Sequence, residues 1–145
     1  MANYPKFDKN TFKNDSFVKK IDKPWGYELH WTPETLPYMG KVIHVKAGAR
    51  LSLQVHDKKQ ESWYLINGRG KVIWENNLGE LIETELEKGK GYGCSLGQRH
   101  RLAGITDCDI VEVSTPEIGT TFRLEDDYKR PDETEEQRKK ERGEK

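Results

Sequence analysis

Short runs of hydrophobic residues alternate with polar positions along most of the chain, and glycine, proline or asparagine residues separate the runs. Alternation with a period of two is typical of strands that bury one face. The turns recur about every eight to twelve residues, which indicates an all-β sandwich or barrel of about nine or ten short strands. Strands are predicted at residues 26–31, 39–46, 61–66, 71–75, 80–86, 100–105, 109–116 and 120–124, and the stretch 48–68 contains a further alternating segment.

The two ends of the chain lack this alternation. Residues 1–22 are polar and rich in lysine, and we interpret them as an arm that is disordered or packs across a neighbouring subunit. Residues 23–130 form the predicted domain. Residues 131–145 contain almost no apolar side chain, although opposite charges four residues apart favour a helix. This tail is expected to bury nothing and to be disordered or a frayed helix.

Composition narrows the class of protein. A chain of 145 residues predicts one domain, and 34% charged against 33% hydrophobic residues predicts a modest core. Lys+Arg and Asp+Glu both number 25, so charge offers no reason to expect nucleic acid or an anionic membrane as a partner. Cys94 and Cys108 lack metal-type spacing and are expected to be reduced thiols. The N-terminus shows no apolar signal region and no run has transmembrane length, so we expect a cytoplasmic protein.

Three potential metal ligands gather in the stretch 48–68. Gln54 and His56 lie two residues apart in an alternating segment and therefore project to the same face. Glu61 begins the next strand-like run and comes back beside them if the two runs form a hairpin. An amide oxygen, an imidazole nitrogen and a carboxylate oxygen converging on one point indicate a divalent metal site.

A second motif adds a fourth ligand. The glycine-rich segment 89–104 ends in a strand that begins with His100. Together the two segments resemble the paired signatures of the cupin family, with glutamine in place of the first histidine, and serine and glycine in place of a proline and an asparagine. This resemblance implies a jelly-roll β-barrel, also called a double-stranded β-helix. It implies four metal ligands: Gln54, His56, Glu61 and His100.

Within the cupins the chain resembles the mannose-6-phosphate isomerases, and most closely the cupin domain of the type II enzymes. The matching pieces are KPWGYE, VKAGARLSLQVH, ESWYLINGRG, RHRLAG and FRLEDDYKR, which span roughly residues 23–130. The chain departs at Lys129, where the family usually has glycine, and at Val55 and Asp57, where it tends to have histidine. No guanylyltransferase domain is present, so a stand-alone cupin is expected.

The resemblance implies a metal-dependent isomerase that interconverts mannose 6-phosphate and fructose 6-phosphate through an enediol. Zn²⁺ is the first choice of metal, from the family and the four nitrogen and oxygen ligands, and Mn²⁺, Fe²⁺, Co²⁺ or Ni²⁺ also suit such a set. Isomerisation of a related sugar phosphate, a non-heme metal dioxygenase and a non-catalytic sugar-binding cupin are the alternatives. The expected partners are a sugar phosphate and, through sheet edges and the arm, a second copy in a homodimer.

Three residues are candidates for catalysis. Counting in twos from Gln54 places Arg50 in the same cavity, where it would bind phosphate or offset negative charge; the alternative is a surface salt bridge. Lys59, three residues after His56, and Lys41, in the preceding strand, are candidates for the base that transfers the proton. A lysine base needs a lowered pKa, and solvated surface lysines are the alternative.

Further aromatic and basic residues have weaker assignments. Trp25, Trp63 and Tyr64 either stack on a sugar ring or belong to the core, and Trp63 shares the parity of Glu61. Arg101 and Arg123 are candidates for anion contacts. Arg101 directly follows His100 and so projects to the opposite face of the strand, which counts against an anion contact in the cavity. Arg99 projects to that same opposite face and is expected at the surface. The histidines outside the motifs, His30 and His44, are interpreted as ordinary strand residues.

Overall fold

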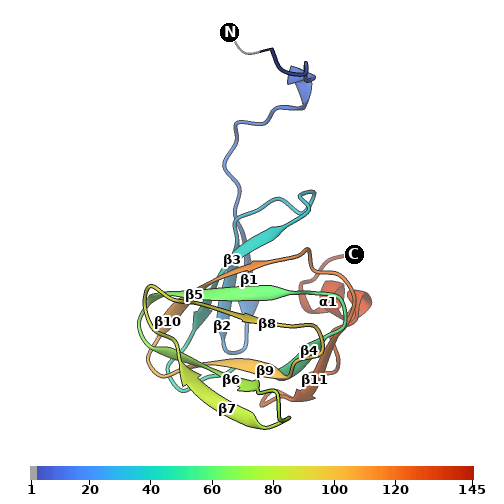
Figure 1. The fold of residues 1–145 in the computed structure, drawn as a ribbon. Helices are drawn as coiled ribbons and strands as arrows, with labels where there is room; N and C mark the ends of the chain where they lie inside the picture. Colours follow the sequence, from blue (N-terminus) through green and yellow to red (C-terminus); the bar gives the residue numbers. More distant parts are fainter. Residues whose placement is uncertain (1–2) are drawn as a thin grey trace.

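In the computed structural model, which describes residues 3–145, two antiparallel sheets face each other (Figure 1). The larger sheet has the order β1 (Lys19–Lys23), β2 (Gly26–His30), β3 (Met39–Val45), β10 (Cys108–Ser114), β5 (Glu61–Asn67) and β8 (Gly91–Cys94). The smaller sheet has the order β11 (Thr121–Glu125), β4 (Leu53–His56), β9 (His100–Gly104), β6 (Gly70–Glu75) and β7 (Leu81–Glu85). The predicted all-β class is confirmed.

Strands distant in the sequence are neighbours in both sheets. β10 lies between β3 and β5, and β9 lies between β4 and β6. The chain therefore crosses repeatedly from one sheet to the other, as in a jelly-roll barrel. One consequence matters for the site: the end of β4 and the start of β5, only a few residues apart, belong to opposite sheets.

The core lies between the sheets because the predicted alternation buries one face of each central strand. β5 alternates strictly between buried and exposed positions over its first six residues, and β10 is nearly as regular. Each fully buried aliphatic or aromatic side chain contributes about 1.5–3 kcal/mol relative to exposure. The cluster consists of Trp25, Ile43, Val45, Trp63, Leu65, Val72, Leu86, Cys94, Leu102, Cys108 and Ile110.

The N-terminal part differs from the prediction in one respect. Residues 19–22, assigned to the arm, form most of β1, which pairs with β2 from Lys19↔His30 to Lys23↔Gly26 and buries Ile21. Residues 3–18 are exposed and extend away from the barrel (Figure 1). Packing of this arm on a second copy, and hence the homodimer, stays a prediction.

The C-terminal segment is ordered and buries charged side chains, which its composition did not predict. Residue Glu133 pairs with Thr121 of β11, and Thr134 caps the helix α1 (Glu135–Glu141) by accepting a hydrogen bond from the Gln137 amide at 3.1 Å. Glu133 and Arg138 are each only 8% exposed. The expectation that this segment buries nothing is therefore wrong, because paired charges can be buried without apolar neighbours.

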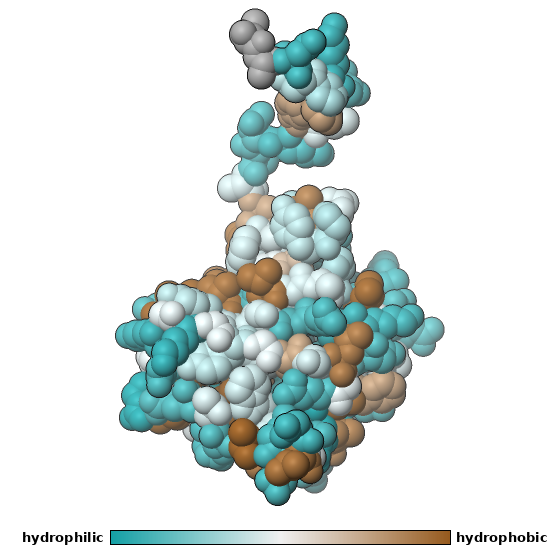
Figure 2. Space-filling model, in the orientation of Figure 1, coloured by the Kyte–Doolittle hydropathy of each residue, from teal (hydrophilic) through white to brown (hydrophobic). Residues whose placement is uncertain are grey.

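Hydrophilic side chains cover most of the face shown in Figure 2, and hydrophobic ones are scattered between them. Such scattering is ordinary for a protein surface. Within the described part of the chain, no helix combines the length and the apolar character that crossing a membrane requires.

Replacing Gly26 by alanine tests the close packing of β2 against β3. Gly26 has a φ of +154°, and an added Cβ would lie 1.9 Å from the carbonyl oxygen of His44. Gly26→Ala should lower the free energy of unfolding by about 1–3 kcal/mol, measured by urea denaturation. Gly91→Ala is the matched control, since its Cβ meets nothing within 4 Å; equal stability of the two variants would contradict this packing.

Candidate metal centre

Three predicted ligands meet between the two sheets. His56 ends β4 and His100 begins β9 in one sheet, while Glu61 begins β5 in the other. Glu61 Oε1 lies 2.8 Å from His100 Nε2 and 3.3 Å from His56 Nε2. All three side chains are buried. The structure thus brings together the histidines and the glutamate that the two sequence motifs predict.

Gln54 completes the set. It lies opposite His100 in the pairing of β4 with β9, and its Nε2 is 3.3 Å from His56 Nε2 and 3.5 Å from His100 Nε2. Binding a cation through the amide oxygen requires a half-turn of this amide. Ser52 permits both orientations: its hydroxyl now donates to Gln54 Oε1 at 2.8 Å, and it can accept from the nitrogen after the turn.

The spacing of these atoms fits a small cation. Four ligands at about 2.0–2.1 Å in a tetrahedron lie about 3.3–3.4 Å from one another, as the bond lengths at zinc require. The distances from the Gln54 amide to the two imidazoles, 3.3 and 3.5 Å, and from His56 to Glu61, 3.3 Å, lie close to that range, whereas His100 and Glu61 are closer, at 2.8 Å. Two imidazoles, one carboxylate and one amide oxygen also form a donor set that suits divalent transition metals.

The outer nitrogens of both imidazoles have partners. His100 Nδ1 donates to the carbonyl oxygen of Gln98 at 2.8 Å, and His56 Nδ1 lies 2.9 Å from the Thr121 hydroxyl. A hydrogen bond at Nδ1 fixes each ring and directs Nε2 toward Glu61, which is the usual arrangement of a metal-binding histidine.

Charge in the site favours a cation. Burial alone would raise the pKa of Glu61, but Lys59 and the two imidazoles lower it well below its ordinary value, so it is a carboxylate. Burial lowers the pKa of His56 and favours a neutral ring. Burial opposes protonation of His100 too, but the Cys94 side chain and Glu61 raise its pKa to about 10. His100 Nε2 therefore donates its proton in a hydrogen bond to the Glu61 carboxylate at 2.8 Å, and a metal would displace that proton.

Gln54, His56 and Glu61 line a cavity of about 50 Å³. A water molecule needs about 10–15 Å³ by this measure, so the cavity holds a few waters but no hexose phosphate. Its wall is unusually rich in charge. The basic residues are Lys23, Lys41, Lys59, Arg123, Arg130 and Arg142, and the acidic residues are Glu28, Glu61, Glu112, Glu117 and Glu133.

Residues 10–133 match the family model described as mannose-6-phosphate isomerase C-terminal. The chain belongs to this family. The xanthan biosynthesis protein XanB of Xanthomonas campestris is 31% identical over 118 residues, covering 77% of this chain and 24% of XanB. The alginate biosynthesis protein AlgA of Pseudomonas aeruginosa is 30% identical, covering 77% of this chain and 23% of AlgA. The chain thus spans about a quarter of the length of these family relatives.

Solved structures agree with the fold. Oxalate decarboxylase from Bacillus subtilis superposes with a TM-score of 0.65 at 21% identity, covering 79% of this chain and 33% of that protein. Both the family and this superposition identify the barrel as a cupin domain that resembles the type II mannose-6-phosphate isomerases. The resemblance and the cupin fold predicted from the motifs are confirmed.

Arg50 lies outside the cavity, contrary to the prediction. Its guanidinium donates two hydrogen bonds of 2.8 Å to the Asp127 carboxylate, and the side chain is 44% exposed. The count in twos fails because β4 begins only at Leu53, so Arg50 precedes the regular strand. Ser52, by contrast, does line the cavity.

Lys41 and Lys59 do line the cavity, and both are buried. Lys59 Nζ lies 3.2 Å from Glu61 and 3.1 Å from Glu112, while Lys41 Nζ lies 3.1 Å from Glu28. Burial lowers the pKa of each lysine, but the carboxylates, Glu112 foremost, raise both above the ordinary value. A base requires the neutral amine, so these surroundings favour the ammonium ion and a role as proton donor or anion contact.

Sequence reasoning missed Glu112. It lies in the middle of β10, 3% exposed, and accepts a hydrogen bond from Trp63 Nε1 at 3.4 Å. Burial first, and then Glu61, raise the pKa of Glu112 to about 7 against the opposing effect of the lysines. The available signal was a carboxylate at an inward-facing position of an otherwise apolar strand, DIVEVS.

The remaining candidates divide between core and cavity. Trp63 belongs to the core, with its ring 5.4 Å from that of His100, whereas Trp25 is core and also lines the cavity. Tyr64 is exposed. Arg101 is buried and donates to the carbonyl oxygen of Leu51 rather than to the cavity. Arg123 lines the cavity.

Metal binding gives a direct test of the centre. Protein treated with a chelator should bind one Zn²⁺ per chain in calorimetry, and His100→Ala should weaken binding by about 100-fold or more, because it removes a ligand. His44→Ala is the control, since His44 is not one of the candidate ligands and its ring nitrogen contacts Asp109 at 2.7 Å. Zinc affinity that is equal in His100→Ala and the unmodified protein would refute the centre.

Proposed function

We propose that this protein is a metal-dependent aldose–ketose isomerase acting on a sugar phosphate, with mannose 6-phosphate and fructose 6-phosphate as the pair of substrates. The observation that carries the proposal is the convergence of Gln54, His56, Glu61 and His100, of which the first three line a cavity with six basic side chains. Membership of the mannose-6-phosphate isomerase C-terminal family supports the substrate. Relatives named for xanthan and alginate biosynthesis are consistent with sugar chemistry.

The reaction moves a proton between adjacent carbons while the carbonyl migrates. A bound divalent cation would polarise the carbonyl and stabilise the charge of the enediolate. Lys59 supplies a second positive charge at the same place, because its ammonium group touches the ligand Glu61. Because the Lys59 side chain is buried in the barrel, this charge acts more strongly than it would in solvent.

Glu112 is the better candidate for the group that carries the proton. Its Oε2 lies 3.1 Å from Lys59 Nζ and 3.5 Å from Lys41 Nζ, so the carboxylate and both ammonium groups form one cluster beside the metal ligands. In this arrangement the Glu112 carboxylate accepts the proton from carbon, and the lysines donate hydrogen bonds to the substrate oxygens. Zn²⁺ remains the first choice of metal. Mn²⁺ is the second, in view of the Mn(II) centres named for the oxalate decarboxylase of the same fold.

A coupled assay decides between the candidate activities. Purified protein with added Zn²⁺, Mn²⁺ or Fe²⁺ should convert mannose 6-phosphate to fructose 6-phosphate, and chelation should abolish the conversion. Consumption of oxygen without isomerisation would identify a dioxygenase instead. Binding of mannose 6-phosphate with neither activity would identify a sugar-binding cupin.

Substitution of Glu112 separates catalysis from metal binding. Glu112→Gln removes the proton-accepting carboxylate but no metal ligand, so kcat should fall about 10²–10⁴-fold while zinc content stays the same. Arg50→Ala is the control, because its partner Asp127 lies outside the cavity. Native kcat in Glu112→Gln would overturn this assignment, and a large loss in Arg50→Ala would restore the role predicted from the sequence.

A further inference from the structure

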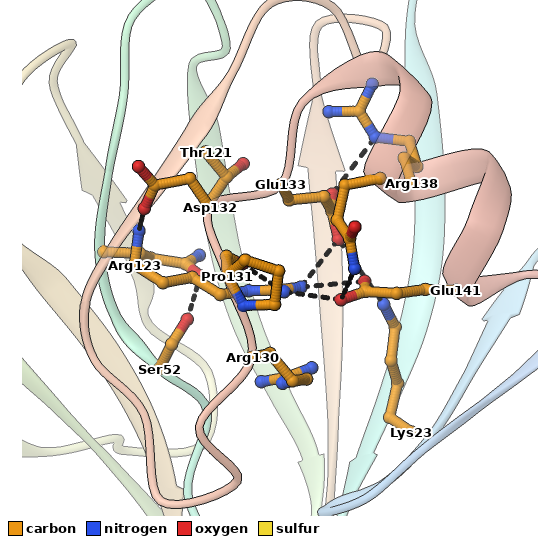
Figure 3. Close-up of polar contacts among 12 residues, drawn as sticks. Lys23, Ser52, Thr121, Arg123, Arg130, Pro131, Asp132, Glu133, Arg138 and Glu141 are labelled. Atoms are coloured by element: carbon orange, nitrogen blue, oxygen red, sulfur yellow. Dashed lines mark hydrogen bonds and ion pairs between the residues drawn. The ribbon is translucent and has the colours of Figure 1, made fainter.

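The C-terminal cover, as we name residues 131–145, closes one side of the cavity. Its first residues run beside β11, where the backbone of Glu133 pairs with that of Thr121. Figure 3 shows Pro131, Glu133 and Glu141 arranged around the guanidinium of Arg123. The Glu133 side chain forms part of the cavity wall. The cover therefore lies over the basic part of the site.

Arg123 is one point of attachment of the cover. Its guanidinium donates to Glu141 at 2.6 and 3.0 Å and to Glu133 at 2.9 Å, and its side chain is only 3% exposed (Figure 3). Lys23 lies 3.8 Å from Glu133. The carboxylate oxygens around this guanidinium resemble the oxygens of a phosphate group. Arginine binds carboxylates and phosphates in the same forked, two-bond geometry.

This guanidinium is connected to the metal ligands by the sheet. Arg123 lies directly opposite Gln54 in the pairing of β11 with β4. Side chains opposite each other in an antiparallel pair lie on the same face. Both side chains line the one cavity, so a ligand that touches Gln54 at one end has Arg123 within the same enclosure.

The cover is held by charge rather than by apolar contact. Arg138 is the one buried residue of α1, and it donates to the carbonyl oxygens of Glu117 and Gly119 at 3.3 Å each. Arg142 is bound to the Glu117 carboxylate at 2.5 Å. A helix of seven residues has little stability of its own. The family match ends at residue 133, so α1 lies beyond the part shared with the family. Such a segment can leave when its ion pairs are replaced.

We propose that Glu133 and Glu141 occupy an anion subsite on Arg123, and that a phosphorylated ligand replaces them and opens the cover. The size of the cavity supports this: about 50 Å³ admits no hexose phosphate until a wall moves. The ligand as a sugar phosphate rests on the proposed function, whereas the anion subsite rests on Arg123 and its two carboxylates alone.

Hydrogen exchange and calorimetry on the full chain test the proposal. Inorganic phosphate is the first probe, followed by mannose 6-phosphate and unphosphorylated mannose. Both phosphates should accelerate amide exchange in α1, and mannose should not. Glu141→Gln should bind inorganic phosphate about tenfold more tightly, because the ligand no longer displaces a charge-assisted pair. Glu136→Gln is the control, with the same charge change at an exposed position of the same helix.

Several results would overturn the proposal: no binding of phosphate, unchanged exchange in α1 with phosphate bound, or equal affinity in the two glutamine variants. Because the exchange measurement uses the unmodified chain, it decides even if Glu141→Gln fails to fold. The two proposals fail separately. Release of α1 by phosphate without isomerase activity would remove the proposed function and keep the subsite. Isomerase activity with α1 protected from exchange throughout would keep the proposed function and remove the subsite.

Discussion

The pairing of buried charges inside the barrel, most of them on neighbouring strands of the larger sheet, is the constraint on which this structure depends. Glu61, Glu112, Lys41 and Lys59 all have side chains at most 8% exposed. Taking one such ion from water costs several kcal/mol unless partners surround it. Here the partners come from different strands: Lys41 from β3, Glu61 from β5 and Glu112 from β10. The charges are therefore compensated only when these strands are correctly aligned.

The same pairing prepares the site for chemistry. Because Lys59 and the imidazoles hold Glu61 as a carboxylate, a ligand oxygen with full charge is available inside a low-dielectric barrel. Trp63 connects the apolar cluster to the site, because its ring lies 5.4 Å from that of His100. Apolar packing thus supports His100, whereas ion pairs surround Glu61.

One local departure from the family pattern fits this picture. Lys129, where the resemblance leads one to expect glycine, adopts a φ of +55°, a left-handed conformation that costs a residue with a side chain about 1–2 kcal/mol. The turn is nevertheless held, since Asp126 accepts bonds from the Arg130 backbone at 2.8 Å and from its guanidinium at 2.9 and 3.0 Å. The Asp126–Arg130 pair keeps Arg130 at the cavity wall without the glycine.

The amino-acid sequence by itself determined most of the strand pattern, the cupin signatures and the candidate metal ligands, because these depend on alternation and on fixed spacings within two short motifs. Spacing failed for Arg50, where the strand begins later than counting assumes. Only the tertiary structure showed that Glu112, Arg123 and Glu133 of the C-terminal cover lie at the cavity. The surroundings of these groups come from partners that are not adjacent in the sequence, as with Arg123 and Glu141. The electrostatic compensation of a buried charge depends on distances that local sequence does not contain.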